Sequence, residues 1–315
     1  MINVKYYEQR SAYDADKPKL ILPNVSYCED TDEVFYNPKS EPHDYSQDYL
    51  TFVAEEDGTF KFSNNISYSL DEGVTWTALA INTDSPTILA GGKIMWKATL
   101  TPEMYAGIGI FHSSGKFITQ GNAMSLLYGD DFKGQTAIND FCFYYLFSGC
   151  TGLTSAENLS LPATTLTFFG YCDMFNGCTR LTTAPVLPAT TLGVNCYDGM
   201  FRGCTSLTTA PALPATTLAS YCYHYMFSGC TSLTTAPELP ATTLANNCYT
   251  YMFYGCTNLN SITCLATDIS ISSCTTNWVD GVAATGTFIK AASMTSWTTG
   301  NNGIPSGWTV QDYQS

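Results

Sequence analysis

The chain has 315 residues, with 13 Lys and Arg against 27 Asp and Glu, and a formal net charge of −14. This acidic balance argues against a nucleic-acid-binding protein, which needs clustered cations to displace counterions from phosphate. It also argues against electrostatic docking on an anionic membrane. No apolar run of about 18 residues is present, so the sequence predicts no membrane span. We also expect no secretory signal, because residues 1–8 lack an apolar stretch.

The first part of the chain, residues 1–49, combines prolines with acidic residues and tyrosines. Pro18, Pro23, Pro38 and Pro42 interrupt any regular element. Proline cannot donate a backbone hydrogen bond and favours turns and extended chain. We therefore expect residues 1–49 to form an extended arm or attachment segment.

Residues 50–141 read as a separate β-domain. Apolar and polar residues alternate from Phe52 to Leu70, and Asp71-Glu72-Gly73 is suited to a hairpin turn. A further strand pair is expected to run through residues 94–96 and Phe111, and another strand lies near Phe117. The pattern predicts a β-sandwich-like domain.

Two short motifs in this domain resemble catalytic proteins. Residues 69–76 match the Ser-x-Asp-x-Gly-x-Thr-Trp box of sialidase-like propellers, but only one copy is present. Residues 128–131, Tyr-Gly-Asp-Asp, match the metal-binding turn of template-copying polymerases, yet the acidic chain offers no basic channel. We interpret the first as a structural hairpin and the second as a solvated turn.

An internal repeat dominates residues 142–273. Its anchor, Phe-x-Gly-Cys-Thr, begins at Phe147, Phe175, Phe201, Phe227 and Phe253. The fullest unit reads Cys-Tyr-x-x-Met-Phe-x-Gly-Cys-Thr-x-Leu-Thr-Thr-Ala-Pro-x-Leu-Pro-Ala-Thr-Thr-Leu. One such unit cannot bury its apolar face alone, so the repeats must stack.

Each coil should hold one short extended segment at its Leu and Pro residues and one or two helical turns at Cys-Tyr-x-x-Met-Phe. The Pro residues should keep strand pairing between coils short. The expected fold class is therefore mainly β with short helical turns: a β-sandwich-like domain followed by a leucine-rich-repeat-like solenoid of about five coils. Residues 274–315, with Trp278, Trp297 and Trp308, should cap its last coil.

The chain contains 13 cysteines. Most recur at the repeat period rather than in pairs, which favours reduced and buried thiols. Disulfides between stacked coils remain an alternative, since neighbouring strands lie about 5 Å apart. The spacing of eight residues between Cys196 and Cys204 is not a zinc spacing. We expect neither a metal site nor a cofactor.

The repeat resembles the BspA-type leucine-rich repeats of bacterial surface proteins, in particular the Thr-rich, Met-Phe-x-Gly-Cys versions of gut Bacteroidales and their phages. Residues 124–134 are similar to the module that precedes such repeats, and residues 296–305 are similar to their usual ending. The resemblance implies adhesion or recognition at a cell surface, or a place in a virion. It supplies no catalytic residues.

Side chains that differ between near-identical coils are candidates for an outward recognition surface. They vary in the two positions after the recurring tyrosine and in the position after the anchor Phe. The tyrosines themselves form either a contact stripe or a column packed between coils. The candidate residues are Tyr197, Asp198, Arg202, Tyr223, His224, Ser228, Tyr249, Thr250 and Tyr254.

Three functions follow from these observations. The first is a phage virion structural protein, a fibre or decoration protein, without enzymatic activity. Its N-terminal region would contact other virion proteins, its solenoid would bind a host-surface glycan or protein, and a fibre would imply a homotrimer. The second is a bacterial cell-surface or secreted adhesin. The third is a carbohydrate-active hydrolase, for which no pair of converging carboxylates is visible.

Overall fold

The structure is a computed structural model and describes residues 25–28, 33–36, 43–103 and 106–314. The chain forms two compact units, residues 1–44 and 45–315. In the first unit, strands β1 (Val25–Cys28) and β2 (Glu33–Tyr36) pair antiparallel. An extended arm was expected over residues 1–49. Apart from these two strands, its part up to residue 42 lies outside the described residues.

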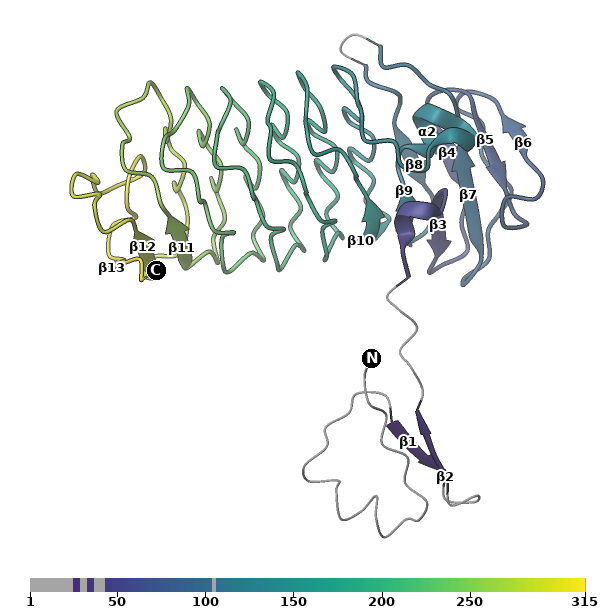
Figure 1. Cartoon of the computed structure of the whole chain (residues 1–315), viewed down its shortest axis with the longest axis horizontal. Helices are drawn as coiled ribbons and strands as arrows, with labels where there is room; N and C mark the ends of the chain where they lie inside the picture. The colour runs from purple at the N-terminus through teal and green to yellow at the C-terminus, as the bar shows by residue number, and fades with distance from the viewer. Residues whose placement is uncertain (1–24, 29–32, 37–42, 104–105, 315) are drawn as a thin grey trace. The chain divides into compact units, whose positions relative to one another are not determined.

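The second unit begins with two β-sheets (Figure 1). A six-stranded sheet has the order β10-β9-β3-β7-β5-β6, and β4 pairs with β8 in a two-stranded sheet. The strands are β3 (Leu50–Ala54), β4 (Phe60–Phe62), β5 (Ile66–Ser69), β6 (Thr77–Leu79), β7 (Lys93–Lys97), β8 (Phe111–Ser113), β9 (Phe117–Asn122) and β10 (Leu153–Ser160).

Aromatic side chains fill the space between these two sheets. The ring centroid of Phe52 on β3 lies 5.2 Å from that of Phe60 on β4 and 4.8 Å from that of Phe111 on β8. Both inward-facing residues of β4 are buried, as alternation in a half-buried strand predicts. Large aromatic rings bury much apolar area, so this cluster contributes strongly to the stability of the β-domain.

The structure corrects two details of the predicted β-domain. The strands containing residues 94–96 and Phe111 exist but do not pair with each other, since β7 lies between β3 and β5 while β8 pairs with β4. Leu70, expected on the inner face, is 52% exposed because the hairpin turn begins there. The alternating pattern predicted where the strands lie, but it does not indicate which strands pair with each other.

Helices are few and short. A 3-10 helix covers Tyr45–Gln47, α2 covers Ser125–Tyr128, and a second 3-10 helix covers Gly129–Asp131. Every helix in the described part of the chain is too short to cross a bilayer. The second unit is therefore mainly β.

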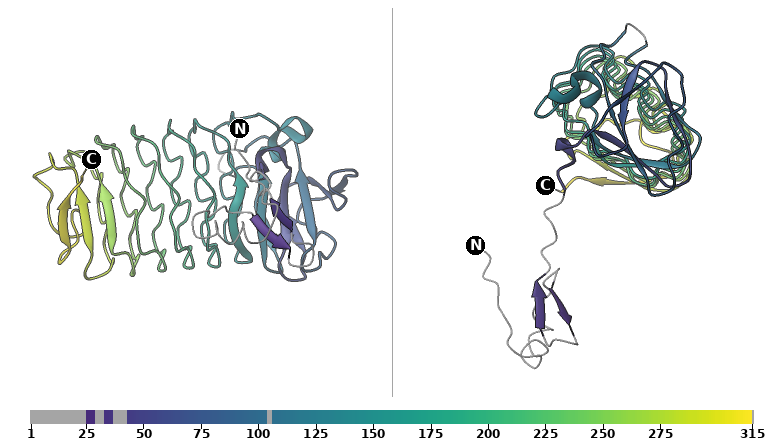
Figure 2. Two further views of the ribbon diagram at one scale, coloured as in Figure 1. Left: turned by 60° about the horizontal axis from the view of Figure 1, so that its bottom comes forward. Right: turned by 90° about the vertical axis from the view of Figure 1, so that its right-hand side faces the viewer.

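The repeats begin where β10 pairs in parallel with β9, so the β-domain passes directly into the first coil. From there the coils follow one another in a row, and the end-on view superposes them (Figures 1 and 2). The predicted boundaries at residues 141 and 273 both lie inside this second unit.

The Cys-Tyr-x-x-Met-Phe segments form a ribbon of consecutive turns, where helical turns were expected. In the third coil the N–H groups of Tyr197, Gly199 and Phe201 donate to carbonyls of the next coil, at 2.8 to 3.1 Å. The residues between them donate within the coil, three residues back, as in the 3.3 Å bond from Asp198 to Asn195. Alternating donors leave no run of i to i−4 bonds, so no α-helix forms.

This ribbon requires a left-handed backbone conformation at every fourth residue. In the third coil these residues are Asn195, Gly199 and Gly203, with φ of 58°, 60° and 71°. The last of them is glycine in every coil, because a residue without Cβ adopts this conformation without a steric penalty. The glycine column comprises Gly149, Gly177, Gly203, Gly229, Gly255 and Gly281.

The interior of the coils consists of aligned identical side chains. Phe175 and Phe201 stack with ring centroids 5.5 Å apart and planes 1° from parallel, and the same contact recurs from coil to coil. Each ring thereby buries both of its faces between its neighbours. This shared use of neighbouring coils explains why one unit is not stable alone.

Extended pairing between the coils is short, as the prolines predict. Between the named strands it consists of single parallel bridges, such as Thr183 with Thr209 and Thr217 with Thr243. Only near the C-terminus do β11 (Ser261–Cys264), β12 (Thr287–Lys290) and β13 (Thr309–Asp312) form a parallel three-stranded sheet. The Pro-free sequence of these segments permits the longer ladder.

The C-terminal region continues the stack before it closes it. Ser273, Asn277 and Gly281 have φ of 55°, 48° and 80°, the same spacing as in the preceding coils. Trp278 is fully buried and stacks between Tyr249 and Trp297. The region predicted as a cap thus contains one more divergent turn of the ribbon.

Candidate functional site

Three positions of each coil vary: the two after the recurring tyrosine and the one after the anchor Phe. In coils two to five eight of these positions hold charged, amide or aromatic side chains that are not buried, whereas Cys172, Ser228 and Thr250 are buried and Gly199 has no side chain. We call the surface of these eight residues the outer ridge, and it comprises Asp173, Asn176, Asp198, Arg202, His224, Tyr225, Tyr251 and Tyr254.

The centre of the outer ridge is an imidazole–carboxylate pair. His224 Nδ1 lies 3.0 Å from Asp198 Oδ1, and each side chain is 19% exposed. Asn195 donates from its amide nitrogen to Asp198 Oδ2 at 3.1 Å. The two coils thus hold a carboxylate with one partner on each oxygen, and a carboxylate can accept about four hydrogen bonds.

Aromatic rings stack on one side of this pair. Tyr225 and Tyr251 are parallel within 3°, with ring centroids 4.7 Å apart. The guanidinium of Arg202 lies 4.9 Å from the centroid of Tyr225, within the range of a cation–π contact. Asn277 donates to the hydroxyl of Tyr251 at 3.2 Å. These contacts fix the rings, so the ridge has little side-chain entropy to lose on binding.

A second carboxylate, Asp173, lies on the other side. Its Oδ1 accepts a 2.8 Å hydrogen bond from Asn176, and a Cβ on Gly199 would overlap this oxygen. Burial, reinforced by the negative charge of Asp198, raises the pKa of Asp173 to about 6. The absence of a side chain at residue 199 therefore makes room for a carboxyl group that titrates near neutral pH.

The structure separates the nine predicted recognition residues into two groups. Asp198, Arg202, His224 and Tyr254 lie on the outer ridge, and Tyr254 is 44% exposed. Five others are buried: Tyr197, Tyr223 and Tyr249, each 1% exposed, and Ser228 and Thr250.

The contact-stripe interpretation of the tyrosines is therefore wrong. Tyr197 and Tyr223 stack face to face inside the coils with centroids 5.9 Å apart, because the turn ribbon directs this position inward. Ser228 and Thr250 vary between coils but are small enough to be covered by neighbours, and the Thr250 hydroxyl donates to the Ser273 carbonyl. A position that varies between coils tolerates different side chains, and a position with small, buried side chains can vary in this way too.

Sequence reasoning missed four residues of the ridge as site members: Asp173, Asn176, Tyr225 and Tyr251. The signal was present, because Gly199, Tyr225 and Tyr251 occupy the same repeat position. Asp173 fell out of the comparison because the cysteine of its unit, Cys172, stands two places away from its usual position.

The twelve cysteines from Cys142 to Cys274 are free and buried. Four of them play a recurring role: the thiols of Cys178, Cys204, Cys230 and Cys256 donate to the carbonyl of the anchor Phe one coil earlier, at 3.0 to 3.1 Å. Burial raises the pKa of Cys256 to about 12. A small apolar side chain with a weak donor fits this position, which accounts for the cysteine column without disulfides.

Each of the two motifs that resemble those of catalytic proteins contains a carboxylate that accepts hydrogen bonds within the β-domain. Asp71 accepts hydrogen bonds from the hydroxyl and amide of Thr75 at 2.6 and 2.9 Å, which hold the pKa of Asp71 down at about 2. Asp130 accepts from Lys97 at 2.7 and 2.8 Å and from the Tyr49 hydroxyl at 2.6 Å. Both carboxylates therefore stabilise turns of the β-domain.

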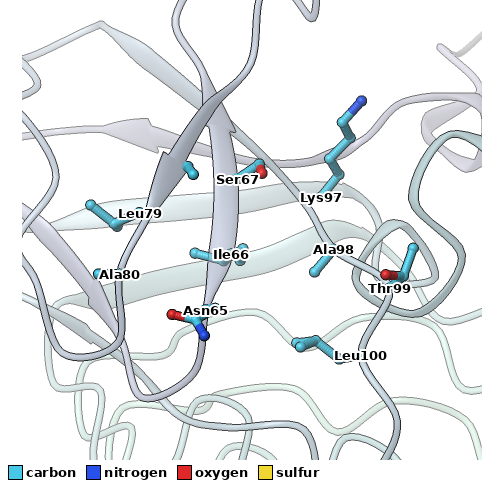
Figure 3. A pocket seen from close by; sticks show the side chains of 10 residues that line it. Asn65, Ile66, Ser67, Leu79, Ala80, Lys97, Ala98, Thr99 and Leu100 are labelled. Atoms are coloured by element: carbon cyan, nitrogen blue, oxygen red, sulfur yellow. The ribbon is translucent and has the colours of Figure 1, made fainter.

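One open hollow of the β-domain is bounded by β5, β6 and residues 97–100 (Figure 3). It encloses about 500 Å³ and is lined mostly by small and aliphatic residues such as Ile66, Leu79 and Leu100. Within the part of the chain that the structure describes, no group of three or more His, Cys, Asp or Glu side chains is placed to hold a metal ion. The outer ridge is therefore the better candidate site.

Comparisons with known proteins leave this assignment to the geometry. No protein-family model matches the chain, and neither a curated protein nor a solved structure gives a significant match.

Proposed function

We propose that this protein is a structural component of a phage virion, a fibre or decoration protein, that presents a repeat solenoid to the host surface. In this proposal residues 142–273 form a BspA-like leucine-rich-repeat solenoid of about five coils. It follows a β-sandwich-like domain over residues 50–141, and residues 274–315 close its end. The proposal rests on the motif resemblance together with the stacking of the coils.

One observation carries the recognition part of the proposal: identical residues fill the interior while different residues occupy the outer ridge. The Phe column stacks at 5.4 to 5.8 Å throughout. The ridge positions change from Asp198 to His224 between two adjacent coils whose cores are the same. A core that tolerates any outward side chain allows the surface to change without loss of fold, as a recognition protein requires.

The hydrogen-bonded stack of coils would also hold the outer ridge rigidly. Each coil contributes backbone hydrogen bonds to the next, such as the 2.7 Å bond from Gly203 to Ser228. Its first coil is joined to the β-domain by the parallel pair of β9 and β10. The N-terminal region would then contact other virion proteins, while the ridge remains available to the host.

Mass spectrometry of purified phage particles tests the virion proposal. Particles that infect gut Bacteroidales and encode this chain are banded by density, and their tryptic peptides are quantified against the major capsid protein. We expect peptides of this chain at a fixed stoichiometry across independent preparations. Their absence from particles, with recovery in the bacterial envelope fraction instead, would contradict the proposal and favour the adhesin.

A further inference from the structure

The central part of the outer ridge offers paired hydrogen-bond donors and acceptors in adjacent coils. Asp198 accepts from Asn195 and is paired with His224, while Asp173 accepts from Asn176 and, at 3.6 Å, from the thiol of Cys172. Each carboxylate retains acceptor capacity, and each amide nitrogen retains a second N–H. A vicinal diol both donates and accepts, so it complements such carboxylate–amide pairs.

The aromatic part of the ridge offers apolar surface beside these polar pairs. Tyr254 is 44% exposed and contacts Tyr251 edge to face, with centroids 5.6 Å apart. Beside the ridge, Tyr221 is 36% exposed, and its ring centroid lies 5.3 Å from that of His224. Exposed tyrosines present a large amphipathic area with few rotatable bonds. Such rings can cover the C–H faces of a ring-shaped, hydroxyl-rich ligand.

Charge limits which ligand of this kind fits. The ridge contains two carboxylates and one guanidinium, and the guanidinium of Arg202 already lies over Tyr225. The negative charge of Asp198 contributes to the raised pKa of Asp173. An anionic ligand would meet the same repulsion, since like charges juxtaposed at an interface oppose binding. The whole chain, at a net charge of −14, adds to this effect.

From these contacts we infer that the outer ridge binds a neutral polysaccharide of the host surface, with Asp198 and Asp173 accepting from its hydroxyls and Tyr254 covering a sugar ring. This inference rests on the proposed function, because it names the ligand of the same surface. Successive coils differ at the ridge, so a sugar chain lying along the stack would meet a different set of side chains at each coil.

A competition assay on whole cells tests the inference. The labelled full-length chain is titrated onto gut Bacteroidales cells, and their surface polysaccharide is separated by anion exchange into neutral and acidic fractions. We expect the neutral fraction to compete and the acidic fraction to have no effect. Periodate oxidation of the cells, which cleaves vicinal diols, should abolish binding, whereas protease treatment should not.

Matched variants assign the binding to the ridge. Asp198→Asn and Tyr254→Ala should each weaken binding about tenfold or more. Glu157→Gln makes the same change of charge as Asp198→Asn at an exposed position on β10 and should leave binding unchanged. Circular dichroism of each variant confirms that the fold is retained.

The possible outcomes separate this inference from the proposed function. Competition by the acidic fraction, or loss of binding on protease treatment alone, would overturn the neutral-polysaccharide inference and leave host recognition standing. Equal binding by the ridge variants and the parent chain would also overturn it. A chain that binds no cells at all would contradict host recognition itself.

Discussion

Tyr225 lies flat on Tyr251, with ring centroids 4.7 Å apart, although both residues have a left-handed backbone, with φ of 51° and 55°. A non-glycine residue in this conformation costs roughly 1–2 kcal/mol. The hydrogen bonds between coils and the ring contact offset this cost. The same backbone that stabilises the stack therefore presents these rings at the surface.

The first prediction concerns the glycine column. Gly203 has φ of 71°, and a Cβ there would meet only the backbone of Gly177 at 3.7 Å. Gly203→Ala should therefore destabilise the fold by the backbone conformation alone, about 1–2 kcal/mol. Urea unfolding measures this difference. An unchanged midpoint would show that the turn ribbon is not formed as described.

The buried tyrosines give a second prediction. The hydroxyl of Tyr223 has no hydrogen-bond partner within the described residues. Removing an unpaired buried hydroxyl is neutral or stabilising, so Tyr223→Phe should change the free energy of unfolding by no more than about 1 kcal/mol in the destabilising direction. Tyr223→Ala should cost about 3–5 kcal/mol through the cavity it leaves. A large loss in the Phe variant would show that the hydroxyl is partnered in solution.

Thiol chemistry gives a third prediction. Burial raises the pKa of Cys150 to about 11 and that of Cys248 to about 12, and the thiolate is the reactive form. In the native chain at pH 8, iodoacetamide should leave the repeat cysteines unmodified, and urea should expose them. Peptide mass spectrometry identifies each site. Rapid native labelling, or disulfide-linked peptides from the repeats, would contradict the buried free thiols.

A fourth prediction concerns pH. The pKa of Asp173 is raised from 3.8 to about 6, mainly by burial, so the native state disfavours its charged form. Between these two pH values the native state binds more protons than the unfolded state, and stability contributed by this group falls as pH rises through about 6. Asp173→Asn should therefore raise stability at pH 7 by up to about 3 kcal/mol.

The pH dependence of that difference is its control. At pH 3.5 Asp173 is protonated in the native state, so Asp173→Asn and the parent chain should have nearly equal melting temperatures. Glu238→Gln, at an exposed position, should have nearly the melting temperature of the parent chain at both pH values. If Asp173→Asn is less stable than the parent chain at pH 7, the prediction is wrong, and the charged carboxylate is stabilised by its contacts in the native state.

The sequence predicted much of the fold and part of the site. The repeat period predicted the stacked interior, and alternation predicted most strands, because both follow from which side chains must be buried. The turn ribbon was not predictable from spacing alone: apolar residues three and four apart also suit a helix, and only the fixed glycine and the frequent Asn and Tyr at left-handed positions signal otherwise. Whether Tyr197 points in or out depends on that backbone, so the sequence left both the contact stripe and the packed column open, and the structure shows the packed column.

The most direct test of recognition by the outer ridge measures binding of the full-length chain to host cells before and after two of its exposed side chains are removed. Arg202→Ala/Tyr254→Ala, both outward, is compared with the parent chain and with Thr190→Ala/Thr216→Ala, which alters exposed positions on other segments of the coils. We expect the ridge variant to lose binding about tenfold or more while the threonine variant retains it. Equal loss in both variants, or none in either, would contradict the assignment of recognition to the outer ridge.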